Sequence, residues 1–482
     1  MRIALIASEC VPFVKTGGLA DVTGALGGAL SALGHEVKVF VPLYRRIDRN
    51  SHGLKASLDL GRLQADCPTP FSFSAWYSRL PGSDAMVHFI DDPESFDLAY
   101  IYGEGTREAH RFVRFQHAVL RVMQQYHWAP DIIHVNDWQT ALIPGLLQTY
   151  YRWDELFVNT KTVLGLHNLA YRGIFDLSVA RDTGLPEEHS LPMGPGEFHG
   201  GFAFLKHGLA SADRIVTVSP TYAAEIRTPA YGEGLDGILR ERGDDLSGIL
   251  NGIDPTVWNP ATDRHLAANY DLGTLARKGE NKRALQARMG LPVDDTIPVM
   301  GIVSRFAYQK GFDLFSSFLE GFLATHPVQL AILGSGDAGV QGYFEHVARS
   351  FPNQLALETG YDEPLAHQIE AGADFFLMPS RYEPCGLNQM YSLAYGTPPI
   401  VRRTGGLADT VVDVHAEPGV GNGFSFDDFT PDALLDAMQR ACALYQDHDA
   451  YRAMQERGMR RDFSWTEQTL RYQALYSDLC KK

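Results

Sequence analysis

The sequence predicts an α/β protein with two doubly wound domains in tandem, each with a parallel sheet covered by helices. Short apolar runs alternate with amphipathic helical patterns, which is typical of such sheets. The alternation occurs in two separate series, and 482 residues are enough for two large domains. Hydrophobic residues make up 45% and charged residues 21% of the chain, which excludes wholesale disorder, collagen and coiled coil.

The first series of apolar runs lies in the N-terminal half of the chain. Helical patterns between these runs include residues 20–33 and 141–150. The strands expected in this half are residues 3–7, 37–41, 132–135, 163–166 and 215–218.

The second series begins near residue 297. Its expected strands are residues 298–303, 329–333, 356–357, 375–378 and 399–401. Its expected helices are residues 313–323, 364–371 and 387–395.

The segment between the two series, residues 251–260, has two prolines and an Asn-Gly turn signal, so we interpret it as an interdomain hinge. Near the end, Ser464-Trp-Thr-Glu467 matches a capping box and opens a last helix that extends to residue 479. The expected domains are residues 1–250 and 251–460, followed by a terminal helical segment, 461–482.

The net charge of −16 and the pI near 5.5 disfavour non-specific binding to nucleic acid or to an anionic membrane, because the mean field of the chain repels phosphates. Any phosphate site must therefore be a local basic pocket. The five cysteines are scattered without a CxxC spacing, which favours a reducing compartment over disulfides or zinc. No signal peptide and no apolar run of about 20 residues is present, so we expect a cytoplasmic protein.

A glycine-rich turn, Lys15-Thr-Gly-Gly18, follows the first strand and precedes a helix. Backbone N–H groups at a helix start, together with the mobile charge of Lys15, suit an anion. The alternative is an ordinary turn with a surface lysine. The GxxxxGK[ST] pattern of a P-loop is absent from the sequence.

Two stretches of the second series combine cations or a carboxylate with a strand end. Arg305 and Lys310 follow the strand at 298–303, and a guanidinium with an ammonium there suits a diphosphate, although two solvated surface cations are equally compatible. Glu383 lies at the carboxyl end of the strand at 375–378, where α/β active sites lie. It would stabilise positive charge on a sugar or orient its hydroxyls. The alternative is an acidic residue at a helix start.

The helix that follows Glu383 is expected to begin near Gly386, so that the N–H groups of Gly386, Leu387 and Asn388 point at an anion. In the first series, His167 and Asp137-Trp138 each follow a strand, and we expect them at the cleft between the domains. Trp138 could offer a sugar a flat apolar face. A structural histidine and a core tryptophan are the alternatives.

Residues 334–339 match the pattern GxGxxG, and Glu358 lies 22 residues beyond Gly336. This spacing resembles the fingerprint of a dinucleotide-binding site. The motif opens the second strand–helix unit of its domain rather than the first, so a tight turn is favoured. No HExxH is present, and the one DxD triplet, Asp447-His-Asp449, is expected in a solvated turn between helices. We therefore expect neither a metal nor a cofactor.

With these motifs in order, the chain resembles the bacterial glycogen synthases and the related plant starch synthases. The similarity covers nearly the whole chain. The matching blocks are residues 15–22, 134–138, 167–173, 212–220, 251–254, 304–311, 381–386 and 403–409.

The resemblance implies two Rossmann-like domains facing a cleft, the glycosyltransferase B-type fold, with the last helix crossing back to the first domain. It also implies transfer of glucose from ADP-glucose to the non-reducing 4-hydroxyl of an α-1,4-glucan, glycogen or a malto-oligosaccharide, with retention of configuration. Carried over by matching residues, the catalytic set is Glu383, Lys310, Arg305 and His167. The implied substrate contacts are Lys15 and Gly18 at the diphosphate, Asp21 at the donor, Tyr361 near the nucleobase, and Asp137, Asn251, Cys385, Gly386 and Leu387.

The sequence departs from the family pattern at Gln139, where His is common, at Asn388, where Thr is usual, and at residues 96–103. Three other functions are weighed against the resemblance. They are a UDP-sugar epimerase on the same fold, a nicotinamide oxidoreductase using residues 334–339, and an inactive glucan-binding regulator. The last is disfavoured because Lys15, Arg305, Lys310 and Glu383 are all retained.

Overall fold

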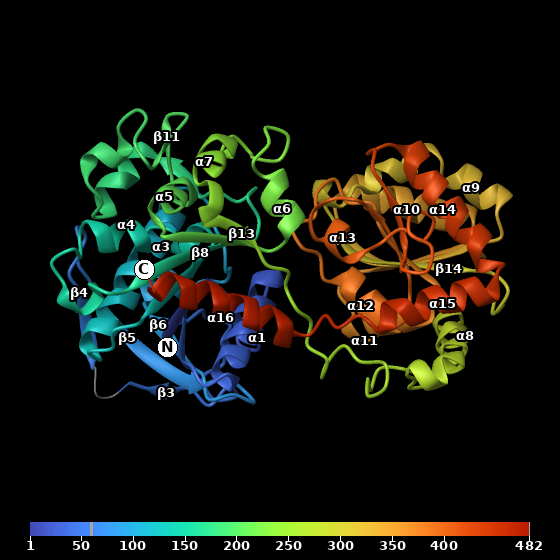
Figure 1. Ribbon diagram of the computed structural model, residues 1–482, viewed down its shortest axis with the longest axis horizontal. Coiled ribbons are helices and arrows are strands. Elements are labelled where there is room, and N and C mark those ends of the chain that lie inside the picture. The colour runs from blue at the N-terminus through green and yellow to red at the C-terminus, as the bar shows by residue number, and fades with distance from the viewer. Residues whose placement is uncertain (58–60, 482) are drawn as a thin grey trace. The chain divides into compact units, whose positions relative to one another are not determined.

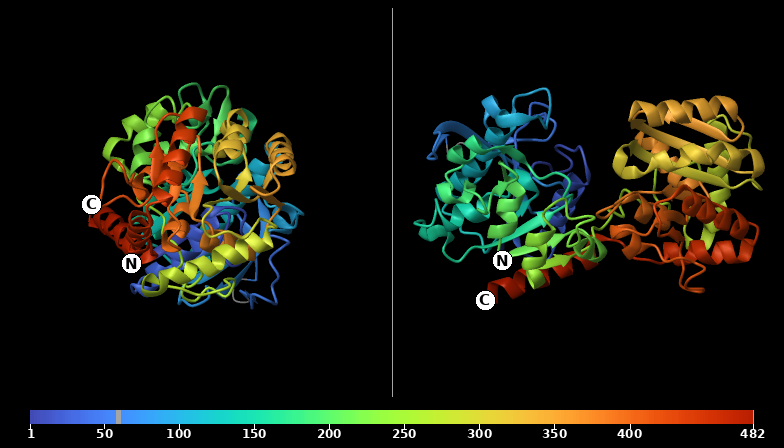
Figure 2. Two further views of the ribbon diagram at one scale, coloured as in Figure 1. Left: turned by 90° about the vertical axis from the view of Figure 1, so that its right-hand side faces the viewer. Right: turned by 90° about the horizontal axis from the view of Figure 1, so that it is seen from above.

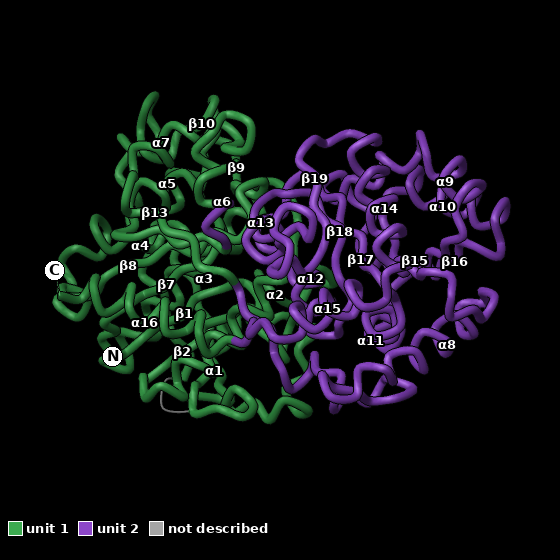
Figure 3. Tube along the Cα trace, turned by 45° about the vertical axis from the view of Figure 1, so that its right-hand side comes forward, with its two compact units in different colours: residues 1–218, 223–250, 465–482 green, residues 219–222, 251–464 purple. Residues whose placement is uncertain are grey.

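The computed structural model describes residues 1–57 and 61–481. Residue 482, the last of the expected segment 461–482, lies outside them. The chain forms two compact units, coloured separately in Figure 3. Unit 1 consists of residues 1–218 and 223–250 and the C-terminal segment from residue 465, and unit 2 of residues 219–222 and 251–464.

Unit 1 is built on one large, mostly parallel sheet with strand order β13-β12-β8-β7-β1-β2-β6-β5-β3, and β4 pairs with β5. The strands are β1 (Arg2–Ile6), β2 (Glu36–Pro42), β3 (Lys55–Ala56), β4 (Arg62–Ala65), β5 (Phe71–Arg79), β6 (Met86–Asp91), β7 (Ile132–Asn136), β8 (Lys161–Leu166), β12 (Arg214–Thr217) and β13 (Leu246–Gly248). From β1 the chain continues to β2 on one side and later returns to β7 on the other side. The loops after β1 and β7 therefore lie at a switch point, where doubly wound sheets bind ligands.

The strands predicted for the first half are all observed. The antiparallel edge formed by β3, β4 and β5 was not predicted. Neither was a separate small sheet of β9 (Ile174–Asp176), β10 (Glu197–Phe198) and β11 (Gly201–Ala203).

The helices of unit 1 cover its large sheet. They are α1 (Gly18–Ala32), α2 (Pro93–Phe96), α3 (Gly105–Gln125), α4 (Ile143–Gln148), α5 (Phe204–Ser211), α7 (Asp236–Glu241) and α16 (Trp465–Lys481), while α6 (Pro220–Glu225) spans the unit boundary. The last helix, α16 (red), packs beside α1 (blue) in Figures 1 and 2. The hydroxyl of Tyr476 on α16 lies 2.7 Å from Nδ1 of His134 on β7, which ties this helix to the sheet.

Unit 2 has an all-parallel sheet in the order β16-β15-β14-β17-β18-β19, which is the doubly wound order 3-2-1-4-5-6. The strands are β14 (Val299–Phe306), β15 (Gln329–Gly336), β16 (Leu355–Thr359), β17 (Phe375–Met378), β18 (Pro399–Arg402) and β19 (Phe424–Phe426). All the strands predicted for the second half are confirmed, and β19 is additional. The switch point lies between β14 and β17, so the loops after these two strands meet at one edge.

Helices pack on both faces of this sheet (Figure 1). They are α8 (Lys278–Arg288), α9 (Leu319–Thr325), α10 (Ala338–Ser350), α11 (Glu363–Gly372), α12 (Asn388–Ala394), α13 (Gly405–Thr410), α14 (Pro431–Tyr445) and α15 (His448–Met459). The single helix predicted over residues 313–323 is wrong. A 3₁₀ segment, Phe312–Ser317, and α9 are separated by Phe318, whose φ of −137° interrupts the helical backbone.

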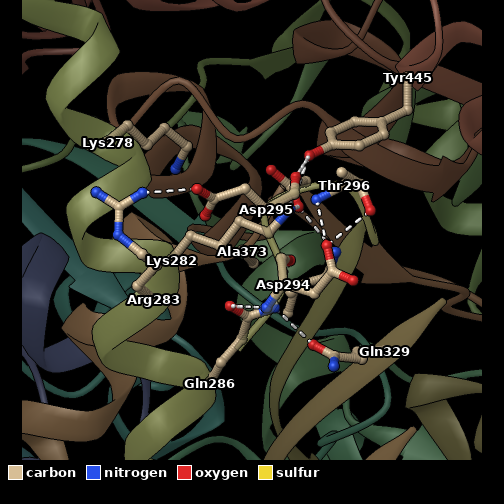
Figure 4. Close-up of polar contacts among 12 residues, drawn as sticks. Lys278, Lys282, Arg283, Gln286, Asp294, Asp295, Thr296, Gln329, Ala373 and Tyr445 are labelled. Carbon is tan, nitrogen blue, oxygen red and sulfur yellow. Dashed lines mark hydrogen bonds and ion pairs between the residues drawn. The ribbon is translucent and has the colours of Figure 1, made fainter. Parts of the chain in front are cut away.

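Helix α8 is mostly polar, yet one side of it is buried against the rest of unit 2, where it takes part in a network of polar contacts (Figure 4). The Lys282 ammonium lies 2.8 Å from Oδ2 of Asp374 and donates to the Tyr445 hydroxyl at 2.7 Å. The Gln286 amide donates to the Gln329 side-chain oxygen at 2.9 Å. Charge pairing therefore adds to the apolar contact of Leu285 with the core of unit 2 in attaching α8. In the described part of the chain, no helix is long and apolar enough to cross a membrane.

Candidate active site

Lys15 lies in the loop between β1 and α1, at the switch point of unit 1. It is exposed, and its ammonium is 2.8 Å from Oδ1 of Asp21 in the first turn of α1. Burial raises the pKa of Asp21, while the charge of Lys15 acts in the opposite direction. Gly17 is the N-cap of α1 and supplies no side-chain cap. The predicted pair of Lys15 and Gly18 therefore lies at a helix start, as expected for an anion site.

A second carboxylate, Glu9, holds this loop from inside. Glu9 is 3% exposed and accepts hydrogen bonds from the Thr16 hydroxyl at 2.7 Å and from the Gly17 N–H at 3.3 Å. It also accepts from the Thr16 N–H and the Tyr102 hydroxyl. Glu9 was not among the residues predicted to lie in the site. The one local signal was a carboxylate placed between a strand and a glycine-rich turn.

Asp137 and His167 follow neighbouring strands, β7 and β8, and are in contact. Oδ1 of Asp137 accepts the His167 N–H at 2.8 Å. Asp137 has φ of 54° and ψ of −171°, an uncommon conformation for a residue with a side chain, and such strain concentrates at functional sites. Burial raises the pKa of Asp137 to about 7, although the N–H groups of His167 and Asn168 oppose the shift.

The hydrogen bonds of His167 define its tautomer. Nε2 of His167 lies 2.9 Å from Oδ1 of Asn136, whose Nδ2 donates to the Ile6 carbonyl at 3.1 Å. The Asn136 oxygen is thus the acceptor, so His167 carries its proton on Nε2 and presents Nδ1 as an acceptor. Burial lowers the pKa of His167 to about 4, so the ring is uncharged at neutral pH.

Trp138 belongs to the core of unit 1. It is 8% exposed, and its ring packs edge-on against Phe112 and Phe175 at centroid distances of 5.1 and 5.3 Å. A Cβ on Gly173 would lie 2.6 Å from the same ring. The core alternative, which is the more common role of a lone tryptophan, is therefore confirmed, and the ring offers no open face to a sugar.

In unit 2, Lys310 and Glu383 meet at the switch point of the sheet. Lys310 ends a short 3₁₀ helix after β14, and Glu383 lies in the loop after β17. The Lys310 ammonium is 2.6 Å from Oε2 of Glu383, which also accepts from the Ser380 hydroxyl at 3.0 Å. Glu383 is 5% exposed. Gly311, with φ of 72°, makes this closeness possible, because a Cβ there would lie 2.1 Å from the Pro379 carbonyl.

Arg305 and Tyr361 lie at the same edge of the sheet but are exposed to solvent. Arg305 is near the end of β14 and makes no side-chain hydrogen bond or ion pair with any described residue. Tyr361 follows β16 and is 89% exposed. The structure therefore pairs Lys310 with Glu383 and leaves the Arg305 guanidinium open for a ligand.

The loop after Glu383 leads into α12. Gly386 has φ of 71°, and the helix begins at Asn388 with Leu387 as an N-cap that supplies no side-chain cap. The Asn388 amide donates to the Val303 carbonyl at 3.1 Å, which ties α12 to β14. The family departure at Asn388 therefore has a structural use.

Asn251, the first residue of the expected hinge, lies against the same loop. Its N–H donates to the thiol of Cys385, and burial raises the pKa of that thiol to about 12. Asn251 is 5% exposed, and its Oδ1 has no hydrogen-bond partner among the described residues. A buried acceptor without a partner is suited to a ligand hydroxyl.

The glycine-rich stretch at residues 334–339 is a tight turn, as favoured. The Asp337 carboxylate accepts from the N–H groups of Gly339 and Val340 at 2.9 and 3.0 Å, so a side chain already fills the start of α10. A Cβ on Gly334 would lie 2.3 Å from the Ser304 carbonyl. Nothing in this geometry favours a nicotinamide site.

Asp447 of the DxD triplet is the N-cap of α15 and accepts from the Ala450 N–H at 3.1 Å. Within residues 1–57 and 61–481, no group of three or more His, Cys, Asp or Glu side chains is arranged to hold a metal ion.

Comparison with known proteins shows the family of the chain. Residues 2–241 match the starch synthase catalytic domain, and residues 286–461 match the glycosyl transferases group 1 family. The chain is 46% identical to a glycogen synthase of Anaeromyxobacter dehalogenans over 99% of both chains. It is 44% identical to a glycogen synthase of Moorella thermoacetica, over 100% of this chain and 97% of that one.

Among solved structures, the catalytic domain of starch synthase IV from Arabidopsis thaliana, bound to ADP and acarbose, is similar with a TM-score of 0.91. It is 32% identical, and the match covers 100% of this chain and 99% of that one. The predicted glycosyltransferase B-type fold is confirmed. The chain therefore belongs to the glycogen synthase family of glycosyltransferases.

Proposed function

We propose that the protein transfers glucose from ADP-glucose to the non-reducing 4-hydroxyl of an α-1,4-glucan, with retention of the anomeric configuration. The observation that carries the proposal is the pairing of Lys310 with Glu383 at the switch point of the unit 2 sheet, in a chain of the glycogen synthase family. ADP bound in the similar starch synthase structure supports ADP as the nucleotide.

In this proposal, cationic side chains hold the donor diphosphate. Lys310 and Arg305 bind its phosphates and stabilise the leaving group, and Lys15 and Gly18 contact the same diphosphate. An ammonium and a guanidinium fork supply charge-assisted hydrogen bonds to phosphate oxygens. The remaining assigned substrate contacts are Asp21, Asn251, Tyr361, Cys385, Gly386 and Leu387.

Glucose transfer then begins as the bond between C1 and the diphosphate oxygen loosens and positive charge spreads over the ring. The acceptor 4-hydroxyl oxygen bonds to C1 on the face that the diphosphate leaves. A phosphate oxygen of the leaving ADP takes the hydroxyl proton, so the products are the extended glucan and ADP. Glu383 orients the sugar and stabilises the developing cation.

His167 and Asp137 are assigned to the hydroxyls of the reacting sugar. The neutral ring of His167 offers Nδ1 as an acceptor, which matches a sugar hydroxyl better than a phosphate. A covalent intermediate on Glu383 is the competing route to retention. Trapping a glycosyl adduct on Glu383 would overturn our choice between the two routes.

The proposal is tested by incubating the protein with glycogen and either radiolabelled ADP-glucose or radiolabelled UDP-glucose. We expect label in the polymer from ADP-glucose, released again as glucose and maltose by enzymes specific for α-1,4 bonds. Labelled polymer from UDP-glucose alone would contradict the assignment of ADP-glucose as the donor. Interconversion of the sugar nucleotide without polymer label would favour an epimerase.

We further propose a cytoplasmic location, which the five cysteines support because none of them forms a disulfide. The expected partners are the sugar nucleotide and the glucan, without nucleic acid or membrane. Fractionation of the source cells, with the protein recovered in the soluble cytoplasmic fraction, tests the location.

A further inference from the structure

Glu9 is a buried carboxylate to which the proposed reaction assigns no role. The nearby Lys15 ammonium pairs with Asp21 and not with Glu9. The partners of Glu9 are therefore neutral hydrogen-bond donors. Oε2 accepts the N–H groups of Thr16 and Gly17, and Oε1 accepts the hydroxyls of Thr16 and Tyr102. Three of these four contacts come from the loop itself and fix its conformation, and the fourth comes from Tyr102.

The Tyr102 hydroxyl connects Glu9 to a distant segment. Tyr102 lies between α2 and α3, in the stretch that departs from the family pattern. Burial and the charge of Glu9 raise the pKa of the Tyr102 hydroxyl, so it stays protonated and donates to Glu9. The Ser8 hydroxyl, 2.8 Å from the Tyr102 oxygen, is then the donor to Tyr102.

Arg111 on α3 holds the segment that carries Tyr102. Arg111 is 2% exposed, and its guanidinium donates to the carbonyl of Ile101 at 3.0 Å and to that of Ser95 at 2.6 Å. The backbone next to Tyr102 is therefore fixed by the helix, and the hydroxyl has little freedom to leave Glu9.

We propose that Glu9 and Tyr102 form a positioning pair that sets the conformation of the turn at residues 15–18 for the donor diphosphate. The inference rests on the proposed function, because it assumes that Lys15 and Gly18 contact that diphosphate. With the N–H groups of Thr16 and Gly17 turned inward to Glu9, the turn presents the Lys15 ammonium and the Gly18 backbone outward. Glu9 is a positioning residue, since it acts through the turn.

Loss of the pair frees two backbone donors and lets the turn relax. A shift of about 1 Å in a binding group reduces rates up to about a hundredfold, so donor binding should weaken measurably. The glucan should be affected little, since this turn is assigned only to the donor.

The test uses Glu9→Gln and Tyr102→Phe in the full-length protein, with Tyr44→Phe as the matched control. Tyr44 is a buried tyrosine of the same unit whose hydroxyl has no hydrogen-bond partner among the described residues. We expect the KM for ADP-glucose to rise about tenfold in Glu9→Gln and about threefold in Tyr102→Phe, the effect of losing one or more charge-assisted hydrogen bonds. The KM for glycogen should change less than twofold, and Tyr44→Phe should match the parent protein.

Hydrogen exchange measured by mass spectrometry provides a readout that does not depend on the reaction. Peptides covering residues 13–19 should exchange faster in Tyr102→Phe than in the parent protein. Their exchange rate in Tyr44→Phe should be unchanged. If the parent protein uses no sugar nucleotide, the proposed function fails, and the exchange result still decides whether the pair holds the turn.

An unchanged donor KM in Tyr102→Phe overturns the proposal, as does an equal rise of the donor and glycogen KM values. In a protein without activity, unchanged exchange of residues 13–19 overturns it. Should Glu9→Gln fail to fold, Tyr102→Phe decides alone, because it removes one hydroxyl and keeps the ring.

Discussion

The ammonium of Lys310 and the carboxylate of Glu383 form an ion pair of 2.6 Å at the carboxyl ends of β14 and β17. In the proposed reaction, one of these groups serves the leaving diphosphate and the other serves the sugar. Each compensates the charge of the other when no substrate is bound, so the pair is maintained in a largely buried site without a net charge.

Removing either member of this pair should abolish most of the transfer. We expect Lys310→Ala and Glu383→Ala each to lower kcat at least about a hundredfold, since electrostatic stabilisation of a transition state contributes about 3 kcal/mol or more. The measurement is initial glucan synthesis at saturating ADP-glucose. Arg283→Ala is the control, because Arg283 on α8 forms only a half-exposed ion pair with Asp295, and this variant should turn over normally. Near-normal turnover in either active-site variant would refute the assigned role.

Glucan synthesis should continue without a divalent ion. Lys310, Arg305 and Lys15 together neutralise the diphosphate in the proposed reaction, so extensive dialysis against a chelator should leave the rate of label incorporation within about twofold. A loss of synthesis that added magnesium restores would contradict this assignment. Addition of magnesium to an undialysed sample is the control for non-specific effects of the ion.

The GxGxxG stretch should affect stability and leave transfer unchanged. Asp337→Ala removes the N-cap of α10 and should lower the free energy of unfolding by about 1 kcal/mol, without a change in kcat. Asp432→Ala, which removes an exposed acidic residue from the first turn of α14 and leaves its Thr430 cap intact, should be nearly neutral. Denaturant titration measures both variants. Binding of NAD detected by calorimetry would contradict the structural role.

Buried histidines should make unit 1 sensitive to acid. Burial lowers the pKa of His88, His134 and His207 to about 3 and that of His117 to about 4, whereas the unfolded chain titrates near 6.5. Below pH 6.5 the unfolded state binds more protons than the folded state. The stability that these neutral histidines contribute is therefore fully present above pH 6.5 and is lost as the pH falls toward their folded pKa values.

His88 is the cleanest test, because its ring stacks on Phe40 and neither ring nitrogen has a partner among the described residues. His88→Phe should remove about 2 kcal/mol of the stability lost between pH 7.5 and pH 5, since one unmatched proton over about 1.5 pH units corresponds to that energy. Thermal unfolding at both pH values measures the difference. An identical pH dependence in the variant would contradict a neutral buried His88.

The contact between Lys282 and Asp374 should be essential to the attachment of α8. Lys282→Met leaves the buried Asp374 carboxylate without its cation and should cost about 3–5 kcal/mol of unfolding free energy. Adding Asp374→Asn should recover part of that loss, because the uncompensated charge is removed. Arg283→Met breaks only an exposed pair and should cost less than about 1 kcal/mol. Equal losses in Lys282→Met and Arg283→Met would contradict the argument.

Several features could not be predicted from local sequence patterns, each for a physical reason. The helix expected over residues 313–323 is interrupted at Phe318, whose backbone conformation differs from its neighbours although its sequence pattern does not. Strands β3 and β4 are short antiparallel edge strands and carry few apolar residues. The sequence left Trp138 with two possible roles, in the core or at a sugar, because its burial depends on Phe112 and Phe175 from other elements.

The sequence by itself determined the two α/β series and the strands of both sheets that lie in apolar runs. It also determined the turns that carry Lys15, Arg305, Lys310 and Glu383. Apolar periodicity and turn chemistry are local properties of a chain, so both can be read from the sequence. Only the tertiary structure decided which of these turns meet. Strand order brings Lys310 to Glu383 across 73 residues and Glu9 to Tyr102 across 93. Such pairings depend on which strands become neighbours, and strand order is a property of the assembled sheet that no local pattern contains.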